Sequence, residues 1–407
     1  MAGPLSHIRV LDLSRVLAGP WAGQVLADLG AEVIKVEKPG VGDDTRGWGP
    51  PFLKDKTGRD TPDAAYFFTT NRGKKSLTLD IAKPEGQEIA RTLAIKSDIL
   101  LENYKVGGLK RYGLDYVSLH KLNPRLIYAS ITGFGQTGPY AERAGYDFMI
   151  QGMGGFMSVT GEADDKPGGG PQKIGVALCD VLTGLFTSTA VLAALAHRER
   201  TGEGQHIDMA LFDVTVAAMA NQATNYLIGG MVPGRMGNAH PNLVPYNAFA
   251  TADHYIIVAV GNDEQFARLA ELLGRPDLAR DPRYATNAAR VANRDALLAL
   301  LTPLFKARDR ASWLDGLEKI GVPGGPINDI AQALAEPQAR ARGLRIELPH
   351  PVAGTVPLVA SPIRMSETPV AYRDAGPMLG EHTDEVLRDL AGLSDAEIAK
   401  LRAQRVV

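Results

Sequence analysis

The amino-terminal segment carries the pattern that most restricts the fold. Residues 8–13 are rich in apolar side chains and predict a buried strand, and residues 21–29 predict a helix with Pro20 near its first turn. After Gly30, residues 32–37 predict a second strand. A strand, a helix and a strand within about 30 residues form a crossover that pairs the strands in parallel. The segment therefore predicts an α/β fold.

The same alternation continues along the first half of the chain. Strands that alternate with helices are typical of a doubly wound, Rossmann-like α/β domain. The further helices expected there cover residues 84–94, 117–122 and 181–198, and the further strands cover residues 98–102, 126–131 and 206–211.

The composition changes near residue 225, where glycine and proline cluster as far as residue 245. We therefore predict a large α/β domain over residues 1–225 and a smaller α+β domain over residues 226–330. Residues 331–407 are expected to return to the large domain through a last helix at residues 384–390. Within the smaller domain we expect a strand at residues 255–260 and helices at residues 263–273, 295–305 and 312–320.

Charge and cysteine content exclude several classes of protein. The formal net charge is −2, whereas a nucleic-acid binder normally carries a basic excess. No apolar run reaches the ~18 residues of a membrane span, and the first residues lack the basic and apolar parts of a signal peptide. Cys179 is the single cysteine, so no intrachain disulfide framework is possible. We expect a cytoplasmic protein without nucleic-acid or membrane partners.

Several well-known catalytic motifs are missing from the sequence. It contains no G-x-S-x-G, H-E-x-x-H, G-x-x-x-x-G-K-[ST] or C-x-x-C pattern. Residues 17–20 follow the first strand but lack the glycine spacing of a dinucleotide-binding turn. The sequence thus gives no support to an NAD enzyme, a P-loop ATPase, a zinc enzyme or a lipase-type hydrolase, and we expect no metal site.

A set of segments, in order along nearly the whole chain, carries a resemblance to a known family. They include LGAEVIKVE, GDDTR, NRGKKS, SITGFG and GEHT, and their positions are residues 10–13, 17–20, 29–37, 42–46, 71–76, 102–104, 130–135, 201–205 and 380–383. Together they resemble the family III CoA-transferases, the formyl-CoA transferase and carnitine CoA-transferase group. Residues 42–51, 225–229 and 244–249 are most similar to the succinyl-CoA:glutarate, or dicarboxylate, branch.

The resemblance implies an activity and an assembly. These enzymes move CoA from an acyl-CoA to a free carboxylic acid, so a CoA thioester is a substrate and no tightly bound cofactor is expected. The donor implied by the branch is succinyl-CoA or a related dicarboxylyl-CoA. The family fold implies a homodimer of two ring-shaped subunits threaded through each other.

The resemblance assigns the catalytic role to Asp180. The family's catalytic aspartate precedes a long helix, and the matching context here is GVALCDVLTG at residues 175–184. Its carboxylate would form an aspartyl anhydride and then an aspartyl-CoA thioester. From position alone, Asp180 is also a good helix N-cap, and the two roles are compatible because a helix N-terminus favours an ionised carboxylate. Cys179 is expected to be a small apolar residue rather than a nucleophile.

Binding residues follow from the family pattern in the same way. Phosphates bind cations and free amides, and each basic candidate has the alternative of an ordinary surface charge. The candidates for contact with CoA are Val16, Leu17, Ala18, Lys38, Arg72, Lys75, Asn103, Arg111, Tyr146 and Asp147. The far carboxylate of a dicarboxylic acid favours a bidentate arginine. The candidates for this substrate contact are Arg15, Arg46, Arg235 and His240, the last of which is equally well explained as a hydrogen-bonded structural histidine.

Two alternatives remain from the sequence. The first is an α-methylacyl-CoA racemase of the same superfamily, whose Gly-His-Asp triplet matches Gly145-Tyr146-Asp147 here. A tyrosine with a pKa near ~10 is a poor proton shuttle at neutral pH, which argues against that activity. The second is a non-catalytic acyl-CoA binding protein, which would keep the CoA contacts without needing Asp180.

Overall fold

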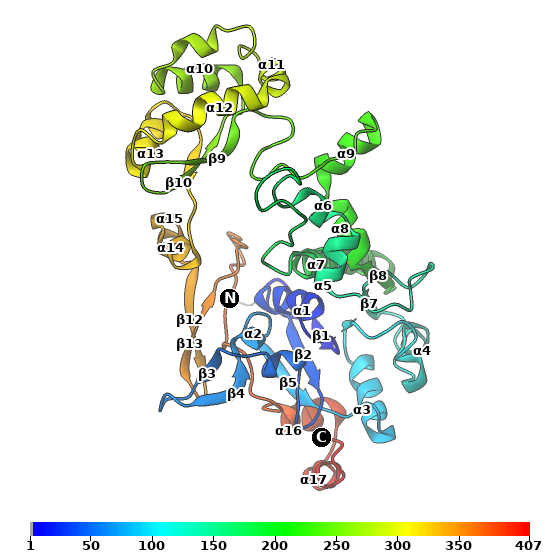
Figure 1. The fold of residues 1–407 in the computed structure, drawn as a ribbon. Helices are drawn as coiled ribbons and strands as arrows, with labels where there is room; N and C mark the ends of the chain where they lie inside the picture. The colour runs from blue at the N-terminus through cyan, green and yellow to red at the C-terminus, as the bar shows by residue number, and fades with distance from the viewer. Residues whose placement is uncertain (1–2) are drawn as a thin grey trace. The chain divides into compact units, whose positions relative to one another are not determined.

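The computed structural model describes residues 3–407, and its internal contacts group them into two units (Figure 1). The first unit comprises Met1–Gly155, Ile174–Ala223 and Pro337–Val407, and the second comprises Phe156–Lys173 and Thr224–Glu336. The expected boundaries at residues 225 and 330 did not include Phe156–Lys173 in the smaller unit. Helix α9 (Ala220–Gly229) runs across the border between the two units.

A six-stranded parallel sheet forms the centre of the first unit. Its strands lie in the order β5-β2-β1-β6-β7-β8, and every neighbouring pair is parallel. The predicted α/β class with a parallel central sheet is confirmed. The strands are β1 (Arg9–Asp12), β2 (Glu32–Glu37), β5 (Lys74–Thr78), β6 (Ile99–Glu102), β7 (Ile127–Thr132) and β8 (His206–Ala210).

Helices cover both faces of this sheet, because alternate residues of each strand point to opposite sides. Val10 and Val33 pack with α1 (Ala18–Asp28) and α7 (Leu178–Thr201) in one buried cluster. Leu11 and Ile34 face the other side. The elements that pack there are α3 (Pro84–Ile95), α4 (Tyr116–Leu122), α16 (Thr383–Val386), the π-helical turn η4 (Leu387–Ala391) and α17 (Asp395–Ala403).

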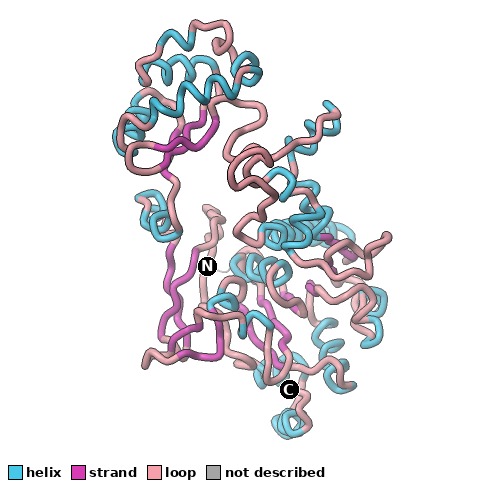
Figure 2. The backbone as a smooth tube through the Cα atoms, viewed as in Figure 1, coloured by secondary structure: helices cyan, strands magenta, loops and turns pink. Residues whose placement is uncertain are grey.

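Shorter elements complete the first unit (Figure 2). Two antiparallel hairpins, β3–β4 and β12–β13, stand apart from the central sheet. Phe67 and Phe68 pack against Leu348 and Val356 of the second hairpin. The bounds are β3 (Phe52–Lys54), β4 (Asp60–Ala64), β12 (Arg345–His350), β13 (Gly354–Val359), α2 (Ala65–Phe68), α5 (Asp147–Met153), α8 (Leu211–Ala218), α15 (Pro337–Ala341), and the 3₁₀ turns η1 (Asp44–Gly47) and η2 (Lys110–Tyr112).

The second unit has a core of its own. A three-stranded antiparallel sheet, in the order β11-β10-β9, packs against helices through Phe249, Phe305 and Trp313. Arg290 is fully buried there and donates to the carbonyl oxygens of Val244 and Tyr284. The elements are β9 (Tyr246–Ala250), β10 (Tyr255–Ala259), β11 (Gly324–Pro326), α6 (Phe156–Val159), α10 (Asp263–Leu272), η3 (Pro276–Ala279), α11 (Asn287–Ala292), α12 (Arg294–Phe305), α13 (Arg310–Lys319) and α14 (Ile330–Ala335).

Helix α7 stands out by its length and apolar composition. Over residues 3–407 it alone is long and apolar enough to cross a membrane by those two criteria. Its inner side contacts α1, α8, β7 and β8 within the first unit. Leu185, Phe186 and Leu192 on the same helix stay exposed. The helix is thus a core element on one side and carries an uncovered apolar face.

Candidate active site

Asp180 lies inside the first turn of α7. The helix begins at Leu178 with Ala177 as its N-cap residue, so Asp180 is the third helical residue and the interpretation of Asp180 as the N-cap is wrong. Asp147, the first residue of α5, supplies the cap from elsewhere, because its Oδ1 accepts the backbone N–H of Cys179 at 2.8 Å. The carboxylate of Asp180 therefore has no capping task in its own helix.

A close approach of two helices brings Asp180 to the N-terminus of α1. A Cβ atom on Gly184 would lie 2.7 Å from the carbonyl oxygen of Ala18 and 2.9 Å from the Cβ of Trp21, so this crossing needs a glycine. Asp180 is one helical turn before Gly184 and shares its face. Its carboxylate accepts a hydrogen bond from the backbone N–H of Ala18. The positive end of the α1 dipole thus faces the carboxylate.

The surroundings of Asp180 make it an unusually weak acid. Burial raises its pKa to about 7, and the negative charge of Asp147 acts in the same direction, while the Ala18 hydrogen bond opposes both. Near neutral pH both the carboxyl and the carboxylate forms of Asp180 are therefore populated. Only the carboxylate is a nucleophile, so the balance of these three influences decides how much of the reactive form exists.

Cys179, next to Asp180, is fully buried. Burial raises the pKa of its thiol to about 12, and the charges of Asp147 and Asp180 add to the effect. The thiolate is the reactive form of cysteine, and it is nearly absent at neutral pH. This environment agrees with the expected structural role of Cys179.

The loop before α1 is held in a strained conformation. Val16 has a φ of +70°, a left-handed region that a β-branched residue rarely adopts and that costs about 1–3 kcal/mol. Its N–H donates to the carboxylate of Asp43 at 3.2 and 3.3 Å. Asn103 fixes the preceding residue, since its side chain accepts from Arg15 N at 2.9 Å and donates to Arg15 O at 2.7 Å. Asn103 therefore fixes the backbone of the loop, a role that was not predicted from the sequence.

Lys35 is fully buried in the middle of β2 and supports the same loop. Its ammonium group forms an ion pair with Asp43 at 2.8 Å and donates to Ser14 O at 2.9 Å. Burial opposes ionisation of Asp43, but the charge of Lys35 holds the pKa of this carboxyl below its usual range. Asp43 is therefore ionised throughout the neutral range.

Lys74 on β5 holds the first turn of α1, which follows the loop. Its ammonium group pairs with Asp12 at 2.9 Å and donates to Pro20 O at 2.9 Å, and both charged side chains are fully buried. Burial lowers the pKa of Lys74 to about 8, against the charge of Asp12. Neither buried lysine was predicted from the sequence as a functional residue. For Lys35 the sequence signal was a charged residue within an apolar strand, because a buried charge needs a partner, whereas Lys74 lies in the polar stretch KKSLT, which carries no such signal.

Arg46 has partners that exclude it as a substrate ligand. Its guanidinium group is 3% exposed and donates to Glu37 at 2.8 Å twice and to Asp63 at 2.8 Å. It also stacks on Phe67, with the guanidinium carbon 3.7 Å from the ring centre. A cation that is buried between two carboxylates in this way is a structural group, and we drop the predicted substrate role of Arg46.

Two predicted phosphate-binding cations are also matched by carboxylates. Arg72 is 7% exposed and makes a bidentate pair with Asp28 at 2.6 and 2.8 Å. Lys75 bridges Glu32 at 2.8 Å and Glu385 at 2.7 Å. These contacts give both residues a structural role, and their predicted contacts with CoA stay predictions.

Other predicted residues stay accessible in the first unit. Lys38 follows β2, Arg111 lies on η2 with its guanidinium over the Tyr112 ring, and both are exposed. Tyr146 is 70% exposed. Arg15 is exposed and forms a surface ion pair with Asp44 at 3.3 Å. Their predicted contacts with CoA or with the acid stay predictions.

Two predicted substrate residues belong to the second unit. Arg235 pairs with Asp164 there and donates from Nε to Glu162 O at 3.3 Å. The Nδ1 atom of His240 accepts the N–H of Asn242 at 3.1 Å. Each of these side chains thus has a local partner within its own unit, and their contacts with substrate stay predictions.

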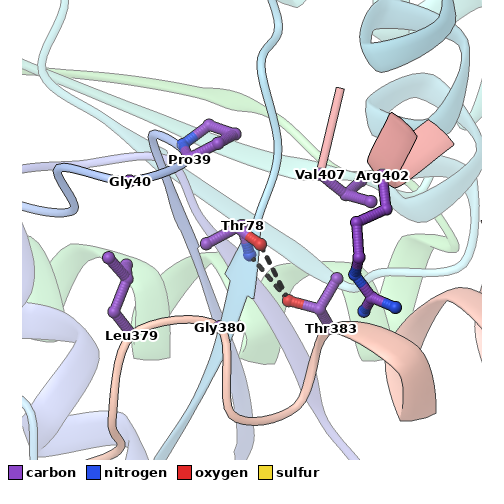
Figure 3. A pocket seen from close by; sticks show the side chains of 8 residues that line it. All are labelled: Pro39, Gly40, Thr78, Leu379, Gly380, Thr383, Arg402 and Val407. Atoms are coloured by element: carbon purple, nitrogen blue, oxygen red, sulfur yellow. Dashed lines mark hydrogen bonds between the residues drawn. The ribbon is translucent and has the colours of Figure 1, made fainter. Parts of the chain in front are cut away.

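A cavity of about 290 Å³ opens beyond the carboxyl ends of β2 and β5 in the first unit (Figure 3). Thr78 donates from its backbone N to Thr383 Oγ1 at 3.1 Å, and the two hydroxyl groups are 3.0 Å apart. The cavity is lined by Pro39, Gly40, Thr78, Leu379, Gly380, Thr383, Arg402 and Val407. None of the predicted site residues lines it. Over residues 3–407, no group of three or more His, Cys, Asp or Glu side chains is arranged to hold a metal ion.

Comparison with known proteins identifies the family. The model of CoA-transferase family III matches residues 5–383. A succinate–glutarate CoA-transferase of Agrobacterium fabrum is 54% identical over 387 residues, which cover 95% of this chain and 96% of that protein. The human succinyl-CoA:glutarate CoA-transferase is 42% identical over 404 residues, which cover 99% of this chain and 90% of that protein.

A solved structure gives the same result. The crystal structure of a CAIB/BAIF family protein from Brucella suis matches the present fold with a TM-score of 0.85 at 54% identity. The match covers 96% of this chain and all of that one, 100%. In sequence and in fold, the chain belongs to CoA-transferase family III and is a CoA-transferase.

Proposed function

We propose that this enzyme transfers CoA from succinyl-CoA, or a related dicarboxylyl-CoA, to a free dicarboxylic acid such as glutarate. The names of the two relatives support these substrates. The observation that carries the mechanism is the position of Asp180, whose carboxylate meets the N-terminus of α1 and has a pKa of about 7. The transferase names of the relatives argue against the racemase and the non-catalytic alternatives.

The reaction that we propose uses Asp180 as a covalent relay. Its carboxylate attacks the thioester carbonyl, the C–S bond breaks, and CoA leaves as a thiolate with the electron pair. The thiolate then attacks the aspartyl carbonyl of the mixed anhydride and releases the donor acid as a carboxylate. The result is an aspartyl-CoA thioester on Asp180.

The acceptor acid reverses these two steps. Its carboxylate attacks the aspartyl thioester and expels the CoA thiolate, which then attacks the acceptor carbonyl of the new anhydride. The new acyl-CoA leaves and the Asp180 carboxylate is regenerated. One thioester replaces another, so the cycle needs no ATP and no net proton. Because a carboxylate is both nucleophile and leaving group, one residue can serve in all four steps.

Replacing Asp180 by asparagine tests the relay. Asp180→Asn removes the nucleophilic oxygen with almost no change in volume, and exchange between succinyl-CoA and glutarate is expected to fall about a thousandfold or more. Hydroxylamine added during turnover should convert residue 180 of the native enzyme to a hydroxamate, which peptide mass spectrometry detects. Asp315→Asn, at an exposed position, is the matched control and should behave like the native enzyme. Full exchange activity in Asp180→Asn would overturn the relay.

The pH dependence tests the state of Asp180. Since the carboxylate is the reactive form, kcat/KM should fall on acidification with a midpoint near pH 7, the pKa to which burial raises Asp180. Asp147→Asn removes a charge that raises this pKa but keeps an acceptor for Cys179, so the acid limb should move to lower pH. Asp213→Asn on α8 should leave it in place. An unmoved limb in Asp147→Asn would assign the titration elsewhere, for example to Glu102, whose pKa burial also raises to about 7.

The choice of acid is tested by pairing several CoA donors with several acceptors and measuring the CoA esters by mass spectrometry. Succinyl-CoA with glutarate is expected to be among the best pairs. Arg15→Leu should raise KM for glutarate roughly tenfold or more, because a charge-assisted hydrogen bond to the far carboxylate is lost, and should spare a monocarboxylic acceptor such as butyrate. Arg91→Leu serves as the control. An equal effect on both acids would exclude Arg15 as the ligand of the far carboxylate.

We also propose that the enzyme is a homodimer, as its family resemblance implies. The exposed face of α7 supports this, since Leu185 is 43% and Leu192 is 38% exposed and the two lie two turns apart. An apolar helix face of this kind is normally covered. Light scattering should give the mass of two chains, and the pair Leu185→Glu and Leu192→Glu should shift it toward one chain. Val117→Glu, at another exposed apolar position, should not. An unchanged mass in the double variant would place the interface elsewhere.

A further inference from the structure

The loop between β1 and α1, together with the first turn of α1, forms a segment that is held by side chains from four separate places in the first unit. Each of these side chains binds a backbone group of this segment, and none of them belongs to the segment itself. The pairs are Lys35 with Ser14 O, Asn103 with Arg15 N and O, Asp43 with Val16 N, and Lys74 with Pro20 O. Ala18, which donates to Asp180, lies in the middle of this segment.

We propose that Asp43, fixed by Lys35, is a positioning residue that holds Val16 in its left-handed conformation and thereby directs the amide of Ala18 toward Asp180. This inference rests on the proposed role of Asp180 as nucleophile and adds a second part to that site. Asp43 precedes η1, and its side chain is buried beneath the loop. It acts through the backbone of the loop and does not contact the reacting atoms.

The contacts of Asp43 show why it can hold a strained residue. Besides Val16 N, its carboxylate accepts from Thr45 N at 2.9 Å, Thr45 Oγ1 at 2.8 Å and Lys35 Nζ at 2.8 Å. These partners fix both carboxylate oxygens, and Asp43 is 1% exposed. An acceptor that is ionised and rigid binds an N–H more strongly than a neutral or mobile one. Val16 can therefore keep a φ of +70° that its own side chain disfavours.

The conformation of Val16 decides where the next amides point. Ala18 follows Val16 by two residues and begins α1, so a return of Val16 to a common backbone region would turn the first N–H groups of the helix away from Asp180. The Ala18 hydrogen bond favours the ionised carboxylate, and its loss would leave burial and the charge of Asp147 unopposed. The groups whose charges interact with Asp180 are Asp147 on α5, Tyr66 on α2 and Cys179 on α7.

Charged groups on the other elements that contact α7 lie outside this set. Helix α1 carries a single charged residue, Asp28, at its far end, where it pairs with Arg72. Strand β8 and helix α8 carry His206, Asp208 and Asp213, and none of them contributes to the raised pKa of Asp180. A shift in the titration of Asp180 after a change at residue 43 would thus report the Ala18 contact.

The experiment compares Asp43→Ala with the native enzyme in exchange between succinyl-CoA and glutarate. We expect kcat to fall roughly ten- to hundredfold, because without Asp43 the strain at Val16 favours other loop conformations by about that factor. KM for succinyl-CoA should stay within about twofold. The acid limb of kcat/KM should move to higher pH, because less Asp180 is ionised at each pH. Asp43→Asn keeps an acceptor for Val16 N and should show the same changes to a smaller extent.

A second substitution separates positioning from a general structural role. Glycine adopts a positive φ without strain, so Val16→Gly should restore a large part of kcat and return the acid limb toward its native position in the Asp43→Ala background. Val16→Gly alone is measured beside it, so that the effect of the glycine itself is subtracted from the rescue. If Asp43→Ala does not fold, the same comparison is made with Asp43→Asn.

The possible results distinguish a structural role of Asp43 from a positioning role, and both from a failure of the relay. If Asp43→Ala lowers the amount of folded enzyme but leaves the pH limb unchanged and is not rescued by Val16→Gly, Asp43 is a structural residue and the inference is wrong. Thermal unfolding of each variant measures that alternative directly. If Asp180→Asn retains full exchange, the relay itself fails, whatever the Asp43 variants do. An inactive Asp180→Asn together with a native-like Asp43→Ala would overturn the positioning role alone.

Discussion

The contact between the N-terminus of α1 and the first turn of α7 is the constraint on which the site depends. Gly184 lets the two backbones meet at Ala18, and the same meeting places the Ala18 amide on Asp180. The helices come from distant parts of the sequence, and the parallel sheet beneath them sets their places. The loop that starts α1 is fixed in turn by buried charges on β2, β5 and the segment after β2. The parallel sheet and these buried charges thus hold the N-terminus of α1 against the first turn of α7.

Much of the sheet could be predicted from the sequence. The expected strand at residues 32–37 is β2, and the expected helix at residues 84–94 became α3 (Pro84–Ile95), because the apolar spacing is regular there. Strand β5 was missed because its lysines suggested a surface that binds phosphate. Helix α7 begins at Leu178 rather than at residue 181, because its cap is provided by Asp147, which is distant in the sequence. A sequence pattern reveals only those capping partners that lie close to the helix in the sequence.

The basic residues that were predicted to bind substrate or CoA show the same limit, because their partners in the folded protein are not visible in the sequence. Arg46, Arg72 and Lys75 have the residue type that binds carboxylates and phosphates, and the structure gives each one a carboxylate of the protein instead. Sequence alone does not reveal such pairs, since the partners are 9 to 310 positions away. Asp180 was found through its family context. Its weak acidity, by contrast, is a property of packing and of Asp147, which no local pattern contains.

The crossing at Gly184 has a consequence for how such an enzyme can change its substrate. Asp180 is positioned by main-chain atoms of α1, because the carbonyl oxygen of Ala18 packs against Gly184 and the amide of Ala18 faces the Asp180 carboxylate. Exposed residues such as Arg15 take no part in that arrangement. Substitutions among these exposed residues can therefore change the surface of the site while the Asp180 carboxylate keeps its place. Under the proposed mechanism, the residues that bind the acid are then different from those that position Asp180. The enzyme can therefore take a new acceptor acid without a change at Asp180 or at the helix crossing.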